Sequence, residues 1–256
     1  MGKIISFSNQ KGGVGKTTSA INLATYVAKA GKKVLLVDFD PQGNATSGFG
    51  VEKNQLVKNC YDVLMGECSP LEVIGPTMVE NLDILPCNMD LAAAEVDLVS
   101  MLARESSLKR AIDPIKGIYD FIFVDCPPSL GLLTLNALVA SDSVIIPIQS
   151  EFFALEGLSQ LVNTIKIVKQ RLNPALTING VILTMYDNRT TMSKQVTAEI
   201  YKYFGDKVYT VPVPRNIKLV ESPSFGVPVV LHAPKSTGAA SYEALAKQFL
   251  QRENAL

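Results

Sequence analysis

Short runs of apolar residues alternate along this chain with longer segments whose apolar positions recur at helical spacing. Most of the short runs are apolar throughout, which is typical of strands that are covered on both faces of a sheet. We predict strands at residues 4–8, 34–39, 82–85, 121–124, 144–148, 178–183 and 208–211.

The segments between these runs predict helices. Residues 18–29 and 155–172 place apolar side chains every three or four positions, and they end before Gly31 and Pro174. Residues 241–252 carry a similar apolar stripe, so we expect this helix to pack on the core. Repeated alternation of strand and helix predicts an α/β fold, with a doubly wound, mostly parallel sheet and helices on both faces. Without repeats or linkers, residues 1–256 are expected to form a single domain.

Composition narrows the class of protein. Of the 256 residues, 47% are hydrophobic and 19% charged, which excludes a disordered chain. The 24 basic and 24 acidic side chains leave no net charge, which argues against permanent DNA binding but not against binding that is switched on. Four cysteines without a C-x-x-C pair favour a reducing cytoplasm. No apolar stretch reaches the roughly 18 residues that a membrane span needs.

A glycine-rich segment joins the first predicted strand to the first predicted helix. Residues 11–18 read Lys-Gly-Gly-Val-Gly-Lys-Thr-Thr, which matches the second half of the phosphate-loop pattern, whereas Gln10 stands where that pattern has glycine. The glycines allow backbone N–H groups to turn toward phosphate oxygens, and the helix N-terminus adds its dipole. Lys16 is placed to meet the β- and γ-phosphates and the Thr17 hydroxyl to bind Mg²⁺. The cofactors predicted are therefore ATP and Mg.

Acidic residues end two of the predicted strands. Asp38 and Asp40 are two positions apart at the end of residues 34–39 and would share one face, while Asp125 follows four apolar residues in a Walker B pattern. The carboxyl ends of such strands border the crevice where ligands bind. His232, the single histidine, lies far from these motifs, so hydrolysis should rest on positioning and be slow.

The glycine-rich segment resembles the deviant Walker A motif of the ParA/MinD family of ATPases. The chromosomal ParA branch, often called Soj, also shares the segments at residues 38–46, 125–131, 154–158, 184–190 and 214–216. The resemblance covers essentially the whole chain. It implies that Lys11 crosses a two-fold interface to touch the partner's ATP, that Asp40 orients the attacking water, and that Asp38 and Asp125 hold Mg²⁺ through water.

The resemblance also assigns the nucleotide contacts. The phosphates would be held by Lys11, Gly12, Gly13, Val14, Gly15, Lys16, Thr17 and Thr18, and the adenine would be bordered by Pro214 and Asn216. Catalytic roles would fall to Lys11, Lys16 and Asp40. In such a protein an ATP-dependent homodimer binds DNA and is released when a ParB-type centromere-binding protein stimulates hydrolysis.

DNA contacts are expected in the last part of the chain. Residues 1–184 carry 15 basic and 18 acidic side chains, whereas residues 185–256 carry nine and six. Within this basic part, Arg189, Lys194 and Lys218 are the candidates, and the resemblance favours Arg189 and Lys218. No helix-turn-helix segment precedes the phosphate loop, so binding should be non-specific and the protein nucleoid-associated in the cytoplasm.

Two other functions use the same scaffold. A MinD-like positioning ATPase would lie on membranes through a basic amphipathic terminal helix. The stripe in residues 241–252 is flanked by only two basic residues, Lys247 and Arg252, which favours a core-packing helix and no membrane partner. A metabolic ATP-dependent ligase is the third alternative.

Overall fold

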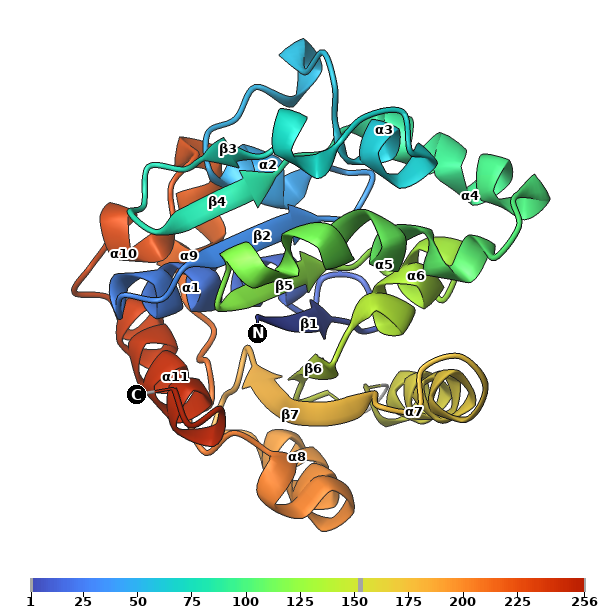
Figure 1. Ribbon diagram of the computed structural model, residues 1–256. Helices are drawn as coiled ribbons and strands as arrows, with labels where there is room; N and C mark the ends of the chain where they lie inside the picture. Colours follow the sequence, from blue (N-terminus) through green and yellow to red (C-terminus); the bar gives the residue numbers. More distant parts are fainter. Residues whose placement is uncertain (1, 152–153, 256) are drawn as a thin grey trace.

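The computed structural model describes residues 2–151 and 154–255, and these contain one seven-stranded sheet (Figure 1). The strand order is β3-β4-β2-β5-β1-β6-β7, and every pair is parallel except the antiparallel β3 and β4. The strands are β1 (Lys3–Phe7), β2 (Val34–Asp38), β3 (Gly75–Pro76), β4 (Leu82–Leu85), β5 (Phe121–Asp125), β6 (Ser143–Gln149) and β7 (Thr177–Thr184). The predicted mostly parallel α/β fold is confirmed.

Helices cover both faces of this sheet (Figure 1). The α-helices are α1 (Lys16–Lys29), α2 (Asn44–Gly48), α3 (Cys60–Met65), α4 (Ala94–Asp97), α5 (Ser107–Ile112), α6 (Leu132–Ala140), α7 (Ala154–Arg171), α8 (Thr191–Phe204), α9 (Ile217–Glu221), α10 (Val229–His232) and α11 (Thr237–Arg252). Short 3₁₀ turns lie at Lys53–Gln55, Pro70–Glu72, Met89–Ala93, Leu98–Ser100, Arg104–Ser106, Asp113–Ile118, Gly205–Lys207 and Ser222–Phe225.

Alternate residues of the central strands enter different cores. In β2, Leu36 packs with α1 and α11 on one face, whereas Leu35 and Val37 pack with α3, α5 and α6 on the other. A third apolar cluster joins β6 and β7 to α7 and α8. All five residues of β2 and of β5 are buried, which explains why these strands read as unbroken apolar runs.

The predicted packing of the C-terminal helix is confirmed. This helix, α11, lies against α1. All residues of its apolar stripe are buried: Tyr242, Leu245, Ala246, Phe249 and Leu250. The Tyr242 hydroxyl also hydrogen-bonds the Ser19 hydroxyl of α1 at 2.9 Å. Among the described residues, no helix has the length and apolar character to cross a bilayer.

The prediction of a strand at residues 208–211 is wrong. Val208 forms only an isolated parallel bridge with Val181, and the Thr210 N–H donates to the side chain of Gln248 rather than to a strand. Pro212 and Pro214 follow and have no N–H to donate, so the pairing is interrupted and resumes only as a second isolated bridge, between Tyr186 and Pro214. The two-residue strand β3 was not predicted because it contains Gly75 and Pro76, residues that are rare in strands.

Candidate functional site

The predicted phosphate loop runs from the end of β1 to the start of α1. Gly13 and Gly15 have φ angles of 72° and 81°, in the left-handed region that glycine adopts without strain. Gly15 is also the N-cap of α1, which has no side-chain cap and no acidic residue in its first turn. The first turn of this helix therefore offers backbone N–H groups and positive potential to an anion.

Lys16 extends from the first turn of α1 into a buried position. It is 6% exposed, and its Nζ donates to the backbone oxygen of Lys11 at 3.3 Å, across the loop. Burial lowers the pKa of Lys16, and the nearby charges of Asp125 and Asp40 oppose that shift. The structure thus brings this cation together with two of the predicted acids.

Those acids lie where the central strands end. Asp38 and Asp125 are paired in the register of β2 and β5, and Phe7 of β1 is aligned with Asp125. Asp40 lies two residues beyond the end of β2, so the expectation that it shares a strand face with Asp38 is wrong. Its carboxylate accepts the backbone N–H of Gln42 at 3.0 Å. All three acids are nonetheless buried at one edge of the sheet.

Asp38 and Asp125 have different surroundings. The Asp38 carboxylate accepts both the N–H and the hydroxyl of Thr46, each at 2.7 Å, and burial raises its pKa to about 6. Asp125 is fully buried, and neither of its carboxylate oxygens has a hydrogen-bond partner among the described residues. Burial and the charge of Asp38 raise the pKa of Asp125 well above its usual value, whereas Thr17 and Lys16 are close enough to lower it in part.

This environment fits a magnesium ion that is shared with phosphates. Among the described residues, no three His, Cys, Asp or Glu side chains are arranged to hold a metal by themselves. Mg²⁺, however, commonly takes one or two carboxylates and completes its shell with water and phosphate oxygens. The unpartnered buried carboxylate of Asp125, next to Thr17 and close to Asp38, has the chemistry that such an ion requires of its protein ligands.

An apolar pocket of about 540 Å³ opens beside the phosphate loop. Gly15 and Thr18 line one side of it, and the segment after residue 212 lines the other, including Pro214 and Asn216, the two residues expected to border the adenine. The volume lies within the usual range for small-molecule sites. The Asn216 side chain is already engaged: it accepts the N–H of Lys218, as the N-cap of α9, and donates to Thr237 at 2.7 Å.

Several residues of the site were not predicted from sequence. Thr184 at the end of β7 donates its hydroxyl to the backbone oxygen of Val14 at 2.8 Å, which ties the phosphate loop to the sheet. Met185 lines the pocket with a φ of 50°, an unusual backbone conformation for a residue other than glycine. All three had a visible signal, since Thr46 closes the shared segment at residues 38–46 while Thr184 and Met185 open the one at 184–190, but the segments gave these residues no role.

Lys11 and the predicted DNA contacts lie on the surface. Lys11 pairs with Glu151 at 3.1 Å. Arg189 is 84% exposed and forms a two-pronged pair with Asp187. Lys194 is exposed on α8, and the Nζ of Lys218 on α9 pairs with Glu221 at 2.8 Å. The acidic partners of Lys11, Arg189 and Lys218 were not predicted from the sequence.

The two surface segments that carry Arg189 and Lys218 are neighbours. Tyr186 and Pro214 form a parallel bridge, and the Tyr186 N–H donates to Val213 at 3.0 Å. Arg215 is close enough to lower the pKa of Asp187, together with Arg189 itself, whose hydrogen bonds cause most of that shift. The basic residues near 189 and 215 therefore share one region of the surface.

Comparison with known proteins gives consistent results. A family model described as an AAA domain matches residues 2–178. The chain is 55% identical to the sporulation initiation inhibitor protein Soj of Bacillus subtilis, over 97% of this chain and 98% of that protein. It is 51% identical to the chromosome-partitioning ATPase Soj of Treponema pallidum, over 99% of each chain.

A solved structure shares the fold over the whole chain. It is described as the crystal structure of cobyrinic acid a,c-diamide synthase from Mycobacterium smegmatis with bound ADP and magnesium. The TM-score is 0.88 and the sequence identity 37%, and the match covers 100% of this chain and 96% of that one.

Proposed function

Because the chain belongs to the Soj/ParA family of chromosome-partitioning ATPases, we propose that it is a nucleotide-controlled partition switch. It binds Mg-ATP, forms a sandwich dimer, and binds nucleoid DNA without sequence preference. A ParB-type protein then stimulates ATP hydrolysis and releases it. The observation that carries this proposal is the buried, unpartnered carboxylate of Asp125 beside Lys16 and the phosphate loop.

Nucleotide binding follows from the parts that surround this carboxylate. Gly12 to Thr18 would wrap the phosphates, and Thr17, Asp38 and Asp125 would hold Mg²⁺, the aspartates through water. The metal would supply charge neutralisation at the phosphates. The base would enter the apolar pocket along Pro214. Since the side chain of Asn216 is engaged with Lys218 and Thr237, it contributes to this pocket as a helix cap that fixes its wall.

Hydrolysis would depend on placement rather than on a strong base. Asp40 is buried close to Lys16, and its Oδ1 accepts one backbone N–H, so capacity remains to orient a water. A carboxylate is a weak base for water, which fits slow turnover that a partner accelerates.

Dimerisation would engage Lys11. Its pair with Glu151 is exposed, and exposed ion pairs contribute only about 0–1 kcal/mol. Lys11 can therefore leave Glu151 at little cost and reach the phosphates of a partner's ATP. A dimer would also present the surface of Arg189, Lys194 and Lys218 twice, which increases DNA affinity through additional phosphate contacts.

A sedimentation assay tests this function. The protein is pelleted with plasmid DNA or with anionic liposomes, in the presence of ATP or ADP. We expect retention by DNA with ATP only. Retention by liposomes alone would instead support a MinD-like membrane ATPase, and the burial of the apolar stripe of α11 already argues against that alternative.

A charge-reversal variant tests the DNA surface. Arg189→Glu combined with Lys218→Glu should abolish retention by DNA while ATP-dependent dimerisation persists. Lys58→Glu, on a surface segment between β2 and β4, is the matched control and should be retained normally. Full retention of the double variant at physiological salt would refute this surface.

A biosynthetic ligase is the second candidate, because the similar Mycobacterium smegmatis structure is that of a cobyrinic acid a,c-diamide synthase. Such an enzyme would consume ATP in the presence of its acid substrate and an amide donor, without DNA. ATP turnover that depends on cobyrinic acid, together with no retention by DNA, would establish this function in place of the partition switch.

A further inference from the structure

The helix that follows Asp125 receives its N-terminal cap from a distant part of the chain. α6 begins at Leu132, and its own N-cap, Gly131, has no side chain to offer. Instead, the Glu95 carboxylate of α4 accepts the N–H of Leu132 at 2.9 Å and that of Leu133 at 3.4 Å. A carboxylate at this position satisfies free N–H groups and favours the helix dipole.

Residues 126–131 connect Asp125 to this capped helix and pass over the phosphate loop. A Cβ added to Gly12 would contact Pro128 at 3.8 Å, so the two segments are adjacent. The near end is held by the Cys126 N–H, which donates to Phe7 at 3.2 Å. Toward the far end, the Thr134 hydroxyl donates to Ser129 at 2.6 Å. The Glu95 contact then fixes the point where the segment enters α6.

The Glu95 carboxylate leaves no room for a side chain at position 131. A Cβ there would lie 2.4 Å from Oε1 and 2.9 Å from Oε2 of Glu95, too close for both to remain in place. Its backbone angles, φ −76° and ψ −168°, are nevertheless accessible to alanine. Glycine is therefore required by the position of Glu95 rather than by the conformation of the chain.

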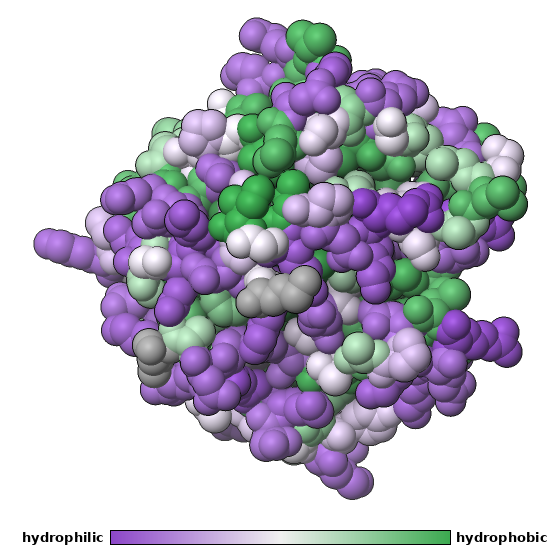
Figure 2. Space-filling view, in the orientation of Figure 1, coloured by the Kyte–Doolittle hydropathy of each residue, from purple (hydrophilic) through white to green (hydrophobic). Residues whose placement is uncertain are grey.

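Glu95 also differs from its neighbours in sequence in how much of it is exposed to solvent. Val96 and Val99 are 72% and 58% exposed, and Figure 2 shows apolar surface at the edge of the molecule that carries α4. Asp97 is exposed as well, and in the described contacts its carboxylate accepts only the hydroxyl of Tyr61. Glu95 is half-buried against α6, so it is not part of the solvated acidic surface of this segment.

We propose that Glu95 is a positioning residue for ATP hydrolysis, which acts by fixing residues 126–131 between Asp125 and the phosphate loop. This inference rests on the proposed function. With both ends of the segment held, Asp125 and Pro128 keep their places beside the nucleotide. The phosphate loop itself does not depend on Glu95, so its loss should lower kcat and leave KM for ATP nearly unchanged.

Four variants test this role through steady-state ATP hydrolysis. Glu95→Ala should lower kcat about tenfold, the effect of about 1.4 kcal/mol, with KM within about twofold. Glu95→Gln should keep an intermediate activity, because its one amide oxygen can still accept the N–H of Leu132 whereas its NH₂ group cannot accept that of Leu133. Gly131→Ala should lower kcat as Glu95→Ala does, since the new Cβ displaces the carboxylate. Asp97→Ala, on the same helix, is the control and should behave as the wild type.

The double variant decides whether the two residues act together. In Glu95→Ala the obstacle to a Cβ at position 131 is gone, so adding Gly131→Ala should cost little more. Fully additive effects, or an unchanged kcat in Glu95→Ala, would overturn the proposal. Amide hydrogen exchange of Leu132 and Leu133 should be faster in Glu95→Ala than in Asp97→Ala.

The exchange measurement also separates this proposal from the proposed function. A wild-type protein that hydrolyses no ATP would refute the ATPase, whereas exchange at Leu132 and Leu133 would still report whether Glu95 fixes α6. Unchanged exchange would overturn the contact itself. Faster exchange with unchanged kcat would overturn its role in hydrolysis.

Discussion

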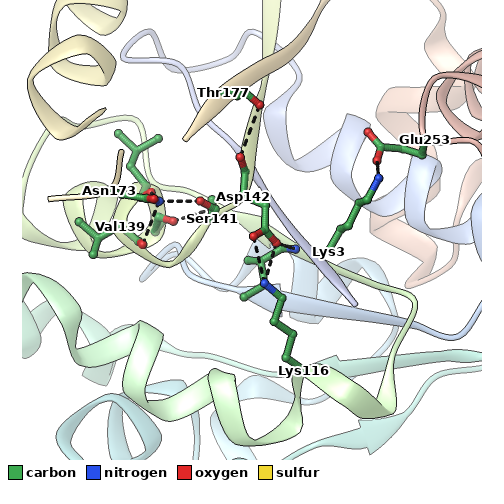
Figure 3. Close-up of polar contacts among 11 residues, drawn as sticks. Lys3, Lys116, Val139, Ser141, Asp142, Asn173, Thr177 and Glu253 are labelled. Atoms are coloured by element: carbon green, nitrogen blue, oxygen red, sulfur yellow. Dashed lines mark hydrogen bonds and ion pairs between the residues drawn. The ribbon is translucent and has the colours of Figure 1, made fainter. Parts of the chain in front are cut away.

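The two edges of the central sheet differ in whether their charged side chains have hydrogen-bond partners within the protein. At the amino ends of the strands, Asp142 accepts the Ile4 N–H at 2.8 Å and the Lys116 ammonium at 2.8 and 3.0 Å (Figure 3). Asn173 nearby donates to the backbone oxygens of three residues, Leu138, Val139 and Ser141. At the carboxyl ends, Asp125 has no described partner and Lys16 meets only a backbone oxygen and the opposing charges of nearby acids.

The difference separates stability from function. Satisfied polar groups at the amino edge lower the free energy of the folded state. An unpartnered buried carboxylate raises that free energy unless a ligand compensates it. The polar groups of the amino edge are therefore satisfied within the protein, whereas those of the carboxyl edge would be compensated by the proposed cation and phosphates.

The largest effect is expected at the carboxyl edge, on turnover. Asp40→Ala removes the group proposed to orient water, and we expect kcat to fall about 100-fold or more while ATP binding and dimerisation persist. Phosphate release measures the change. Asp120→Ala, at the amino edge, is the matched control and should hydrolyse ATP normally. If Asp40→Ala released phosphate at the wild-type rate, the carboxyl edge would not have the role in hydrolysis that distinguishes it from the amino edge.

The next effect concerns association. Lys11→Ala should weaken the ATP-dependent dimer by about 2 kcal/mol or more, because a desolvated charge contact across the interface is lost. Its free energy of unfolding should change by less than about 1 kcal/mol, since the pair with Glu151 is exposed. Sedimentation velocity with ATP is the measurement. Lys58→Ala, which breaks an exposed pair with Glu72, should dimerise normally, and an intact Lys11→Ala dimer would contradict the assignment.

At the amino edge we expect a change in stability without a change in chemistry. Asn173→Ala leaves three backbone oxygens without this donor, which should cost about 2 kcal/mol in the free energy of unfolding. Urea denaturation measures this loss, and kcat per folded molecule should be unchanged. A loss of kcat with unaltered stability would mean that the two edges are not separate in function.

The smallest effect depends on pH. Burial raises the pKa of Asp38 to about 6, so the folded state holds this proton more tightly than the unfolded state does. The resulting stabilisation is complete below about pH 4 and is lost as the pH rises through about 6. Denaturation of the nucleotide-free protein should show this component, and Asp38→Asn should lack it. Identical pH profiles would contradict the raised pKa.

Much of the fold could be predicted from local pattern. Six of the seven predicted strands form, with ends within about one or two residues, because strands such as β2 and β5 are buried on both faces and are apolar throughout. The phosphate loop, Asp38 and Asp125 could be located because the loop follows β1 and the two aspartates are the last residues of β2 and β5. Their positions are fixed by neighbours in sequence.

The remainder depends on partners that are distant in sequence. Residues 208–211 have the composition of a strand, yet Gln248 of α11 takes the N–H of Thr210. Asn216 lines the pocket where it was expected to border a base, and that role stays a prediction, but the engagement of its side chain by Thr237 and the first turn of α9 had no signal in the sequence. Glu95 belongs to no recognised motif, and only the folded chain brings it to α6. Such contacts have no periodicity that a sequence pattern could reveal.

The contact between Ser19 and Tyr242 has a consequence for biosynthesis. Tyr242 lines the apolar pocket and bonds the helix that leaves the phosphate loop, although the two residues are at opposite ends of the chain. A nascent chain still attached to the ribosome has its phosphate loop long before it has this wall of the pocket. If the pocket holds the base as proposed, tight nucleotide binding is expected only after translation has passed α11.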